Sequence, residues 1–144
     1  MDIRIYYEDT DAAGVVYHAN YLKFLERART EYFREKGWLV AQLASDGFVF
    51  PVVRMEINFV SAARHDDLLS IITIPERVGG SSFNMQQSII RKRDSRRLVD
   101  ALVTLACISP QFKARRIPSG IRQLLEMDLL SRHTPNLPAE SSGK

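Results

Sequence analysis

Hydrophobic positions follow one period at the start of the chain and a different period soon after. Ile3 to Tyr7 is a run of β-branched and aromatic residues, which predicts a short strand. From Tyr21 onward, apolar residues recur at steps of three and four while Lys, Arg and Glu fill much of the rest, as on an amphipathic helix. Asn20 is a good N-cap residue, and Gly37 stands where helices commonly end. We expect a long helix here, followed by a short second helix over Val40–Ser45.

The middle of the chain has the character of β-structure. Runs rich in Val, Ile, Leu, Phe and Thr are separated by short polar breaks, R-H-D-D, G-G-S and K-R-D-S-R-R, which are typical of tight hairpins. The expected strands are Phe50–Ala62, Leu68–Val78, Ser81–Lys92 and Arg96–Ser109. Consecutive strands with hairpin links predict an antiparallel meander, and the long helix has the matching apolar stripe to cover one of its faces. The fold class is therefore α+β.

The end of the chain predicts a closing helix over Ile117–Met127 and then a polar tail. We expect one domain over residues 1–130 and a disordered tail over residues 131–144, because the tail is too poor in apolar residues to pack. A helix wrapped by one sheet leaves a β-rich edge uncovered, and a second subunit would cover it. A homodimer is the simplest arrangement.

Composition narrows the class of protein. The chain has 144 residues, 45% of them hydrophobic, which fits a single soluble domain. The single cysteine, Cys107, excludes an intramolecular disulfide and lies in an apolar run, so a buried, inert thiol is expected. The net charge of +3 is spread along the chain without an RNA-binding motif, and this charge alone does not decide between nucleic acid and an anionic small ligand; the partner that we expect is not nucleic acid. Neither a signal peptide nor a membrane span is apparent, which favours a cytoplasmic location.

The densest group of reactive residues lies in Y-Y-E-D-T-D-A-A-G-V-V-Y-H-A-N-Y, between the first strand and the long helix. Asp11 suits either a turn or capping role, or a reactive carboxylate aimed by the sharp turn that Gly14 allows. His18 suits either a structural hydrogen bond or the orientation of a substrate. Backbone N–H groups at the helix start, together with the helix dipole, are suited to hold a developing oxyanion.

This motif and the predicted architecture resemble the 4-hydroxybenzoyl-CoA thioesterase family of hotdog-fold acyl-CoA thioesterases, in particular its YbgC-like, Tol-Pal-associated branch. The likeness runs over residues 3–127 through D-T-D-x-x-G-V-V-Y-H-A-N-Y, L-K-F-L-E-R-A-R-T-E-Y-F, V-V-R-M-E-I-N-F, A-R-H-D-D-L-L and the S-F at Ser82–Phe83. It implies a hotdog fold, with Asp11 as catalytic carboxylate and the backbone amide of His18 polarising the thioester carbonyl. The residues expected to bind substrate are Tyr7, Gly14, Val16, Tyr17 and Asn20.

The resemblance also implies acyl-CoA as substrate, no metal or organic cofactor, and a homodimer or homotetramer with the acyl-pantetheine arm entering between subunits. An acyl carrier protein and Tol-Pal or lipid-synthesis proteins are candidate partners. Two functions remain as alternatives: a hydratase or dehydratase on the same fold, for which the H-F-P-type motif is missing, and a non-catalytic acyl-CoA sensor or scaffold.

Several assignments stay open at this level. Asp11 suits a general base or a nucleophile, and the rival bases on the helix are Glu26, Glu31 and Glu35, whose ordinary role is to pair with neighbouring cations. We expect Asp9 to be structural, Glu8 to be solvated, and His65 to have no chemistry. The cations available to CoA phosphates are Arg91, Lys92, Arg93, Arg96 and Arg97, and a second group, Lys113, Arg115 and Arg116. The loop V-G-G-S-S-F lacks the basic residues that the hydroxybenzoyl enzyme has before its S-F strand.

Overall fold

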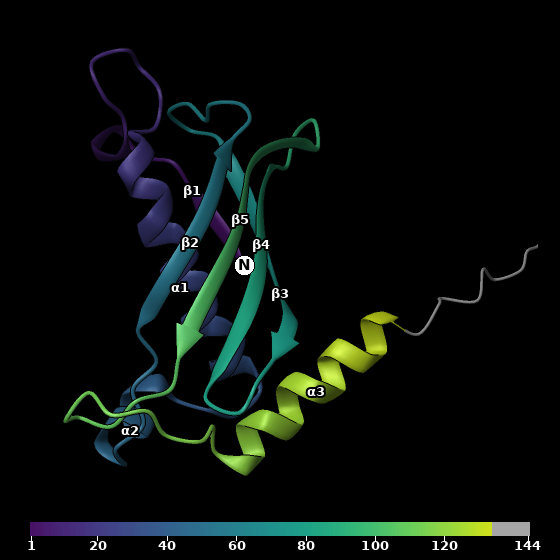
Figure 1. Ribbon diagram of the computed structural model, residues 1–144. Coiled ribbons are helices and arrows are strands. Elements are labelled where there is room, and N and C mark those ends of the chain that lie inside the picture. The colour runs from purple at the N-terminus through teal and green to yellow at the C-terminus, as the bar shows by residue number, and fades with distance from the viewer. Residues whose placement is uncertain (134–144) are drawn as a thin grey trace, which may run out of the picture.

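A computed structural model describes residues 1–133 as an antiparallel sheet with a long helix against one face (Figure 1). The elements are β1 (Asp2–Arg4), the 3-10 turn η1 (Tyr7–Asp9), α1 (His18–Glu35), α2 (Val40–Ser45), β2 (Val52–Phe59), β3 (Leu68–Val78), β4 (Ser82–Arg91), β5 (Arg96–Ala106) and α3 (Ser119–His133). The predicted helix and strand segments are therefore all present, and the α+β class is confirmed. The first strand ends earlier than predicted, because the chain turns into η1 at Tyr7.

The order of the strands differs from the expected meander. The sheet order is β1-β3-β4-β5-β2, and all neighbouring pairs are antiparallel, so β2 pairs with β5 and not with β3. The R-H-D-D break is not a hairpin: the Asp67 carboxylate accepts a hydrogen bond from the Arg64 backbone N–H at 2.9 Å and lies 3.6 Å from the Arg91 guanidinium. The expectation was wrong because a polar break marks the end of a strand without specifying that strand's partner.

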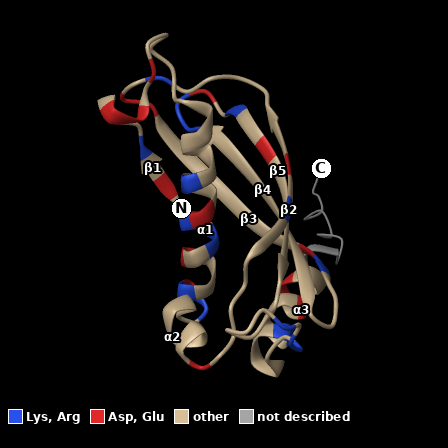
Figure 2. Cartoon of the chain, turned by 60° about the vertical axis from the view of Figure 1, so that its left-hand side comes forward, with Lys and Arg blue, Asp and Glu red and all other residues tan. Residues whose placement is uncertain are grey.

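The core forms between α1 and the concave face of the sheet. Leu25 of α1 and Phe83, Met85 and Ile89 of β4 are fully buried, as the alternation along β4 requires. Burying one such side chain contributes about 1.5–3 kcal/mol. The other side of α1 carries alternating blue and red segments in Figure 2, which is the charged face that the sequence predicts.

The start of α1 corrects one prediction. The helix begins at His18, its N-cap residue is Tyr17, and Asn20 lies inside the first turn, so Asn20 is not the N-cap. The Asn20 side chain instead donates a hydrogen bond to the Asp9 carboxylate at 3.2 Å. The other end of the helix is as predicted, because Gly37 follows the last turn with a φ of +91°, which suits glycine.

The closing helix is longer than expected. α3 runs from Ser119 to His133, beyond the predicted end at Met127, so the boundary placed after residue 130 falls inside a helix. Its buried residues Ile121 and Leu125 join it to the core, and Figure 1 shows it beside β3. The predicted disordered tail lies, from residue 134 onward, outside the described residues.

Candidate active site

The loop before α1 folds into a tight hairpin around Asp11. The Asp11 N–H donates to the Val15 carbonyl at 2.9 Å, and the Gly14 N–H donates to the Asp11 carbonyl at 3.0 Å. Gly14 has a φ of +80°, in the left-handed region that glycine adopts without strain. One Asp11 carboxylate oxygen, Oδ1, accepts the Ala13 N–H at 2.8 Å, and within residues 1–133 the other oxygen has no hydrogen bond. Asp11 therefore holds the turn and still presents a carboxylate oxygen to solvent.

The first turn of α1 lies beside this loop and has no side-chain cap. Tyr17, the N-cap residue, provides no capping hydrogen bond, and the first turn contains no acidic residue. The backbone N–H of His18 has no acceptor in the part of the chain that the structure describes. The positive end of the helix dipole acts at the same place, so this end of α1 is suited to accept an anion.

Asp11 and the start of α1 form one wall of a groove of about 340 Å³. The groove is lined by Asp11, Val15, Val16, His18, Tyr21, Phe59, Val60, Ser61 and Ala62. The Phe59 ring meets the His18 ring edge-on at 6.1 Å, so the end of β2 and the connection that follows it supply the second wall. A carboxylate, free helix amides and a mostly apolar surface are thus brought together.

Tyr21 fixes the two walls to each other. Its buried hydroxyl accepts the backbone N–H of Ala63 at 3.0 Å, and the Val16 N–H donates to the Ala63 carbonyl at 2.9 Å. Burial raises the pKa of the Tyr21 phenol, so it remains neutral. Neither Tyr21 nor the Phe59–Ala62 wall was predicted as part of the site, because the wall is distant along the chain and Tyr21 belongs to the apolar stripe of the helix.

The predicted site residues divide into two groups. Asp11, Val16 and His18 line the groove, and Gly14 and Tyr17 adjoin it in the chain. Tyr7 does not line it: its side chain is 79% exposed, and its ring faces His65 at 6.1 Å. Asn20 also points elsewhere, toward Asp9.

Asp9 has the structural role expected of it. One carboxylate oxygen accepts the Tyr6 N–H at 2.9 Å, and the other accepts the Asn20 side chain at 3.2 Å. Its backbone carbonyl accepts the Tyr17 N–H at 3.0 Å. These bonds hold η1 against the first turn of α1. Glu8, as expected, is exposed to solvent.

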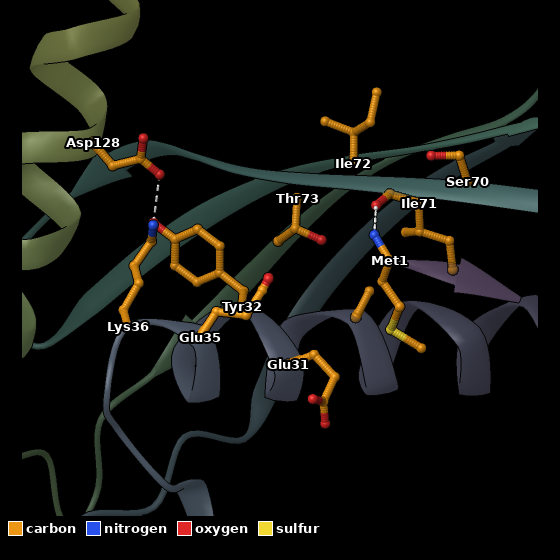
Figure 3. Close-up of a pocket in the computed structure, with 11 residues that line it drawn as sticks. Met1, Glu31, Tyr32, Glu35, Lys36, Ser70, Ile71, Ile72, Thr73 and Asp128 are labelled. Carbon is orange, nitrogen blue, oxygen red and sulfur yellow. Dashed lines mark hydrogen bonds between the residues drawn. The ribbon is translucent and has the colours of Figure 1, made fainter.

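The rival glutamates lie away from the helix start. Glu31 and Glu35 line a separate cavity of about 320 Å³ between α1, β3 and α3, where Tyr32 donates a hydrogen bond to Asp128 (Figure 3). Glu31 pairs with Arg34 at 3.1 Å. Glu26 accepts the Thr30 hydroxyl at 2.7 Å on the exposed side of α1. These carboxylates lie along the helix, where the backbone amides are already bonded, so a developing oxyanion would find no free N–H beside them.

The remaining reactive groups have structural surroundings. Burial raises the pKa of the Cys107 thiol, which makes it the inert group that was expected. Arg115 stacks on the Phe48 ring at 3.9 Å and donates to the Gly47 carbonyl at 2.8 Å.

Within the described residues, His, Cys, Asp and Glu form no group that could hold a metal ion. No helix in residues 1–133 has the length and apolar character needed to cross a bilayer.

An exposed carboxylate beside uncapped helix amides, in a groove with apolar walls, suits a hydrolase that attacks an activated carbonyl group. The chain belongs to the thioesterase superfamily, whose sequence profile matches residues 13–97. This confirms the resemblance drawn from the D-T-D…G-V-V-Y-H-A-N-Y motif, and the sheet wrapped around α1 is the hotdog fold.

Individual proteins similar to this chain are also named as thioesterases or thioester hydrolases. The chain is 39% identical over 120 residues to the acyl-CoA thioester hydrolase YbgC of Escherichia coli O6:H1, covering 83% of this chain and 89% of the relative. It is 42% identical over 107 residues to the acyl-CoA thioesterase YbgC of Haemophilus influenzae, covering 74% and 77%. The crystal structure of a "Probable Thioesterase" from Bartonella henselae matches with a TM-score of 0.78 and 43% identity, over 82% of this chain and 97% of that one.

Proposed function

We propose that the protein hydrolyses acyl-CoA thioesters to a free acid and CoA, with Asp11 as the catalytic carboxylate. The observation that carries the proposal is that the Asp11 carboxylate and the uncapped first turn of α1 line the same groove. The names of the relatives at 39% and 42% identity support acyl-CoA as the substrate class.

In the general-base route, Asp11 removes a proton from a water molecule as the water oxygen attacks the thioester carbonyl carbon. The carbonyl oxygen becomes an oxyanion, which the His18 backbone N–H and the helix dipole stabilise. The tetrahedral intermediate then expels the CoA thiolate, and the proton held by Asp11 neutralises that thiolate. The helix amide cannot be removed by side-chain substitution, so the test falls on Asp11.

In the alternative route, the Asp11 carboxylate itself attacks the carbonyl carbon and releases the CoA thiolate, leaving a mixed anhydride that water then hydrolyses. The free Asp11 oxygen suits either route. Label found in Asp11 after a single turnover in water labelled with ¹⁸O would identify the mixed-anhydride route. Attack of water on the aspartyl carbonyl of the anhydride would leave label in Asp11, whereas the general-base route puts label only into the product acid.

We further propose that the protein is a homodimer in the cytoplasm, joined through β2. β2 is an edge strand of the sheet, and its apolar side chains Val53 and Phe59 are 60% and 49% exposed. An exposed apolar edge strand favours pairing with another strand. Pairing of two dimers into a homotetramer, and contacts with an acyl carrier protein or with Tol-Pal and lipid-synthesis proteins, stay predictions of the resemblance.

The decisive experiment measures thiol release from a panel of acyl-CoAs, from acetyl through long-chain to aromatic, with three proteins: wild type, Asp11→Asn and Glu31→Gln. We expect wild-type hydrolysis that falls by about 10²–10⁴-fold in Asp11→Asn, the range for loss of a general acid–base group. Glu31→Gln removes a carboxylate of α1 that lies outside the groove, and we expect wild-type rates from this variant.

The opposite results have clear meanings. Activity that survives Asp11→Asn but is lost in Glu31→Gln would move the catalytic carboxylate to α1. If wild type binds acyl-CoA but releases no thiol from any substrate, the protein is a sensor or scaffold and the proposal fails. Circular dichroism of each variant excludes loss of fold as the cause.

A further inference from the structure

The basic residues around the β4–β5 hairpin differ in how they are partnered. The ion pairs are Arg91–Asp94 at 2.9 Å, Lys92–Asp2 at 2.9 Å, Arg93–Asp67 at 3.9 Å and Arg97–Asp100 at 2.9 Å. Arg96 is the exception in this run, since its guanidinium forms no ion pair with any residue between 1 and 133. The nearest acid in the chain, Asp94, is occupied: it accepts two hydrogen bonds from Arg91, at 3.1 and 2.9 Å.

Arg96 is also the member of the run that touches the candidate active site. Its Nε donates a hydrogen bond to Ser61 Oγ at 3.0 Å, and Ser61 lines the groove that contains Asp11. The backbone N–H groups of Val60 and Ser61 donate to the Leu98 carbonyl at 2.8 and 3.1 Å, so this wall of the groove is joined to β5 beside Arg96. One donor of the guanidinium is therefore used to hold it at the rim, and its terminal NH₂ groups remain for a ligand.

The arrangement of the elements favours the same residue. The Asp11 loop, the connection from β2 to β3 and the β4–β5 hairpin all lie at one end of the sheet (Figure 1), and blue segments mark the same end of β5 in Figure 2. The other basic group, at Lys113–Arg116, lies at the opposite end of the chain's fold, near α2, and its Arg115 is already bonded to Gly47. Among the basic residues of these two groups, Arg96 is thus the one that lies beside the groove with a guanidinium that forms no ion pair with any residue from 1 to 133.

We propose that Arg96 binds a phosphate of the thioester's carrier and so holds the pantetheine arm across the groove, with the acyl carbonyl at Asp11. The inference rests on the proposed thioesterase function and names a binding residue for it. A guanidinium presents paired N–H donors that match two phosphate oxygens, which suits this contact. The phosphate shared by CoA and a carrier-protein phosphopantetheine, and the nucleotide phosphates of CoA, have the same chemistry, so the test separates them.

The test compares wild type, Arg96→Gln and Arg97→Gln on thioesters of one acyl group with pantetheine, 4′-phosphopantetheine and CoA. For Arg96→Gln, we expect the ratio of kcat/KM on acyl-CoA to kcat/KM on acyl-pantetheine to fall about tenfold, the effect of one solvent-accessible, charge-assisted hydrogen bond. Arg97→Gln removes the same charge from the next residue, whose partner is Asp100, and we expect the wild-type ratio from it.

The phosphopantetheine thioester identifies the phosphate. An equal fall with acyl-phosphopantetheine assigns Arg96 to the phosphate that CoA and a carrier protein share, and a fall only with acyl-CoA assigns it to the nucleotide. A ratio in Arg96→Gln within about twofold of wild type overturns the proposal. If wild type hydrolyses none of these thioesters, the proposed function fails. The inference on Arg96 is then judged by calorimetry with free CoA, where equal Kd values for wild type and Arg96→Gln would refute it.

Discussion

The hydroxyl of Tyr21 is expected to stabilise both the fold and the shape of the groove. Replacing it in Tyr21→Phe removes the acceptor of the Ala63 backbone N–H, which lies on a fully buried residue. A buried donor without a partner costs about 1–3 kcal/mol of unfolding free energy. For a chain of 144 residues, with an unfolding entropy of about 2.1 cal/mol/K per residue, this corresponds to a fall in Tm of roughly 3–10 °C.

The assays are chemical denaturation, thermal unfolding at a fixed protein concentration, and amide hydrogen exchange at Ala63. We expect faster exchange at that amide, together with a KM that rises more than kcat falls, because the Phe59–Ala62 wall loses its tie to α1. Tyr17→Phe is the matched control for stability, since Tyr17 is 48% exposed and its hydroxyl has no hydrogen bond in the described part of the chain; we expect a change within about 0.5 kcal/mol. A Tyr21→Phe protein with wild-type stability and unchanged exchange at Ala63 would refute the reasoning.

Three further predictions follow from other contacts. Gln87 Oε1 accepts a hydrogen bond from the buried Arg29 guanidinium at 3.0 Å. Gln87→Leu is therefore expected to lower the unfolding free energy by about 1.5–3 kcal/mol in urea titrations, and wild-type stability would contradict this. Arg91 lowers the pKa of Asp94 from 3.8 to about 2, so the stability that this ion pair contributes is complete above pH 3.8 and is lost as pH falls toward 2. Asp94→Asn should flatten that part of a profile of stability against pH, and an unchanged slope would argue against the pair. Val53→Lys places a charge on the exposed edge strand, and we expect sedimentation to show monomer where wild type shows dimer, whereas a dimeric variant would exclude this edge as the interface.

The sequence by itself determined the elements and the reactive loop, because both depend on neighbours along the chain. The period of three and four fixed α1, the apolar runs fixed the strands, and Gly37 marked the helix end through its backbone conformation. The same local density of acids, glycine and histidine pointed to Asp11 and His18, which do line one groove. The family could also be recognised from the sequence, since the D-T-D…G-V-V-Y-H-A-N-Y motif is continuous along the chain.

The tertiary structure decided what depends on partners far apart in the chain. β2 pairs with β5 although the break at 64–67, β3 and β4 lie between these two strands in the sequence. No local pattern specifies this pairing. The same pairing places Phe59–Ala62 opposite Asp11, which completes the groove. Tyr7 and Asn20 lie outside it because their side chains contact His65 and Asp9. The tertiary structure also distinguishes Arg96 from its equally charged neighbours. A neighbour such as Arg97 already forms an ion pair with a carboxylate, whereas the Arg96 guanidinium forms none with residues 1–133 and remains free for a ligand.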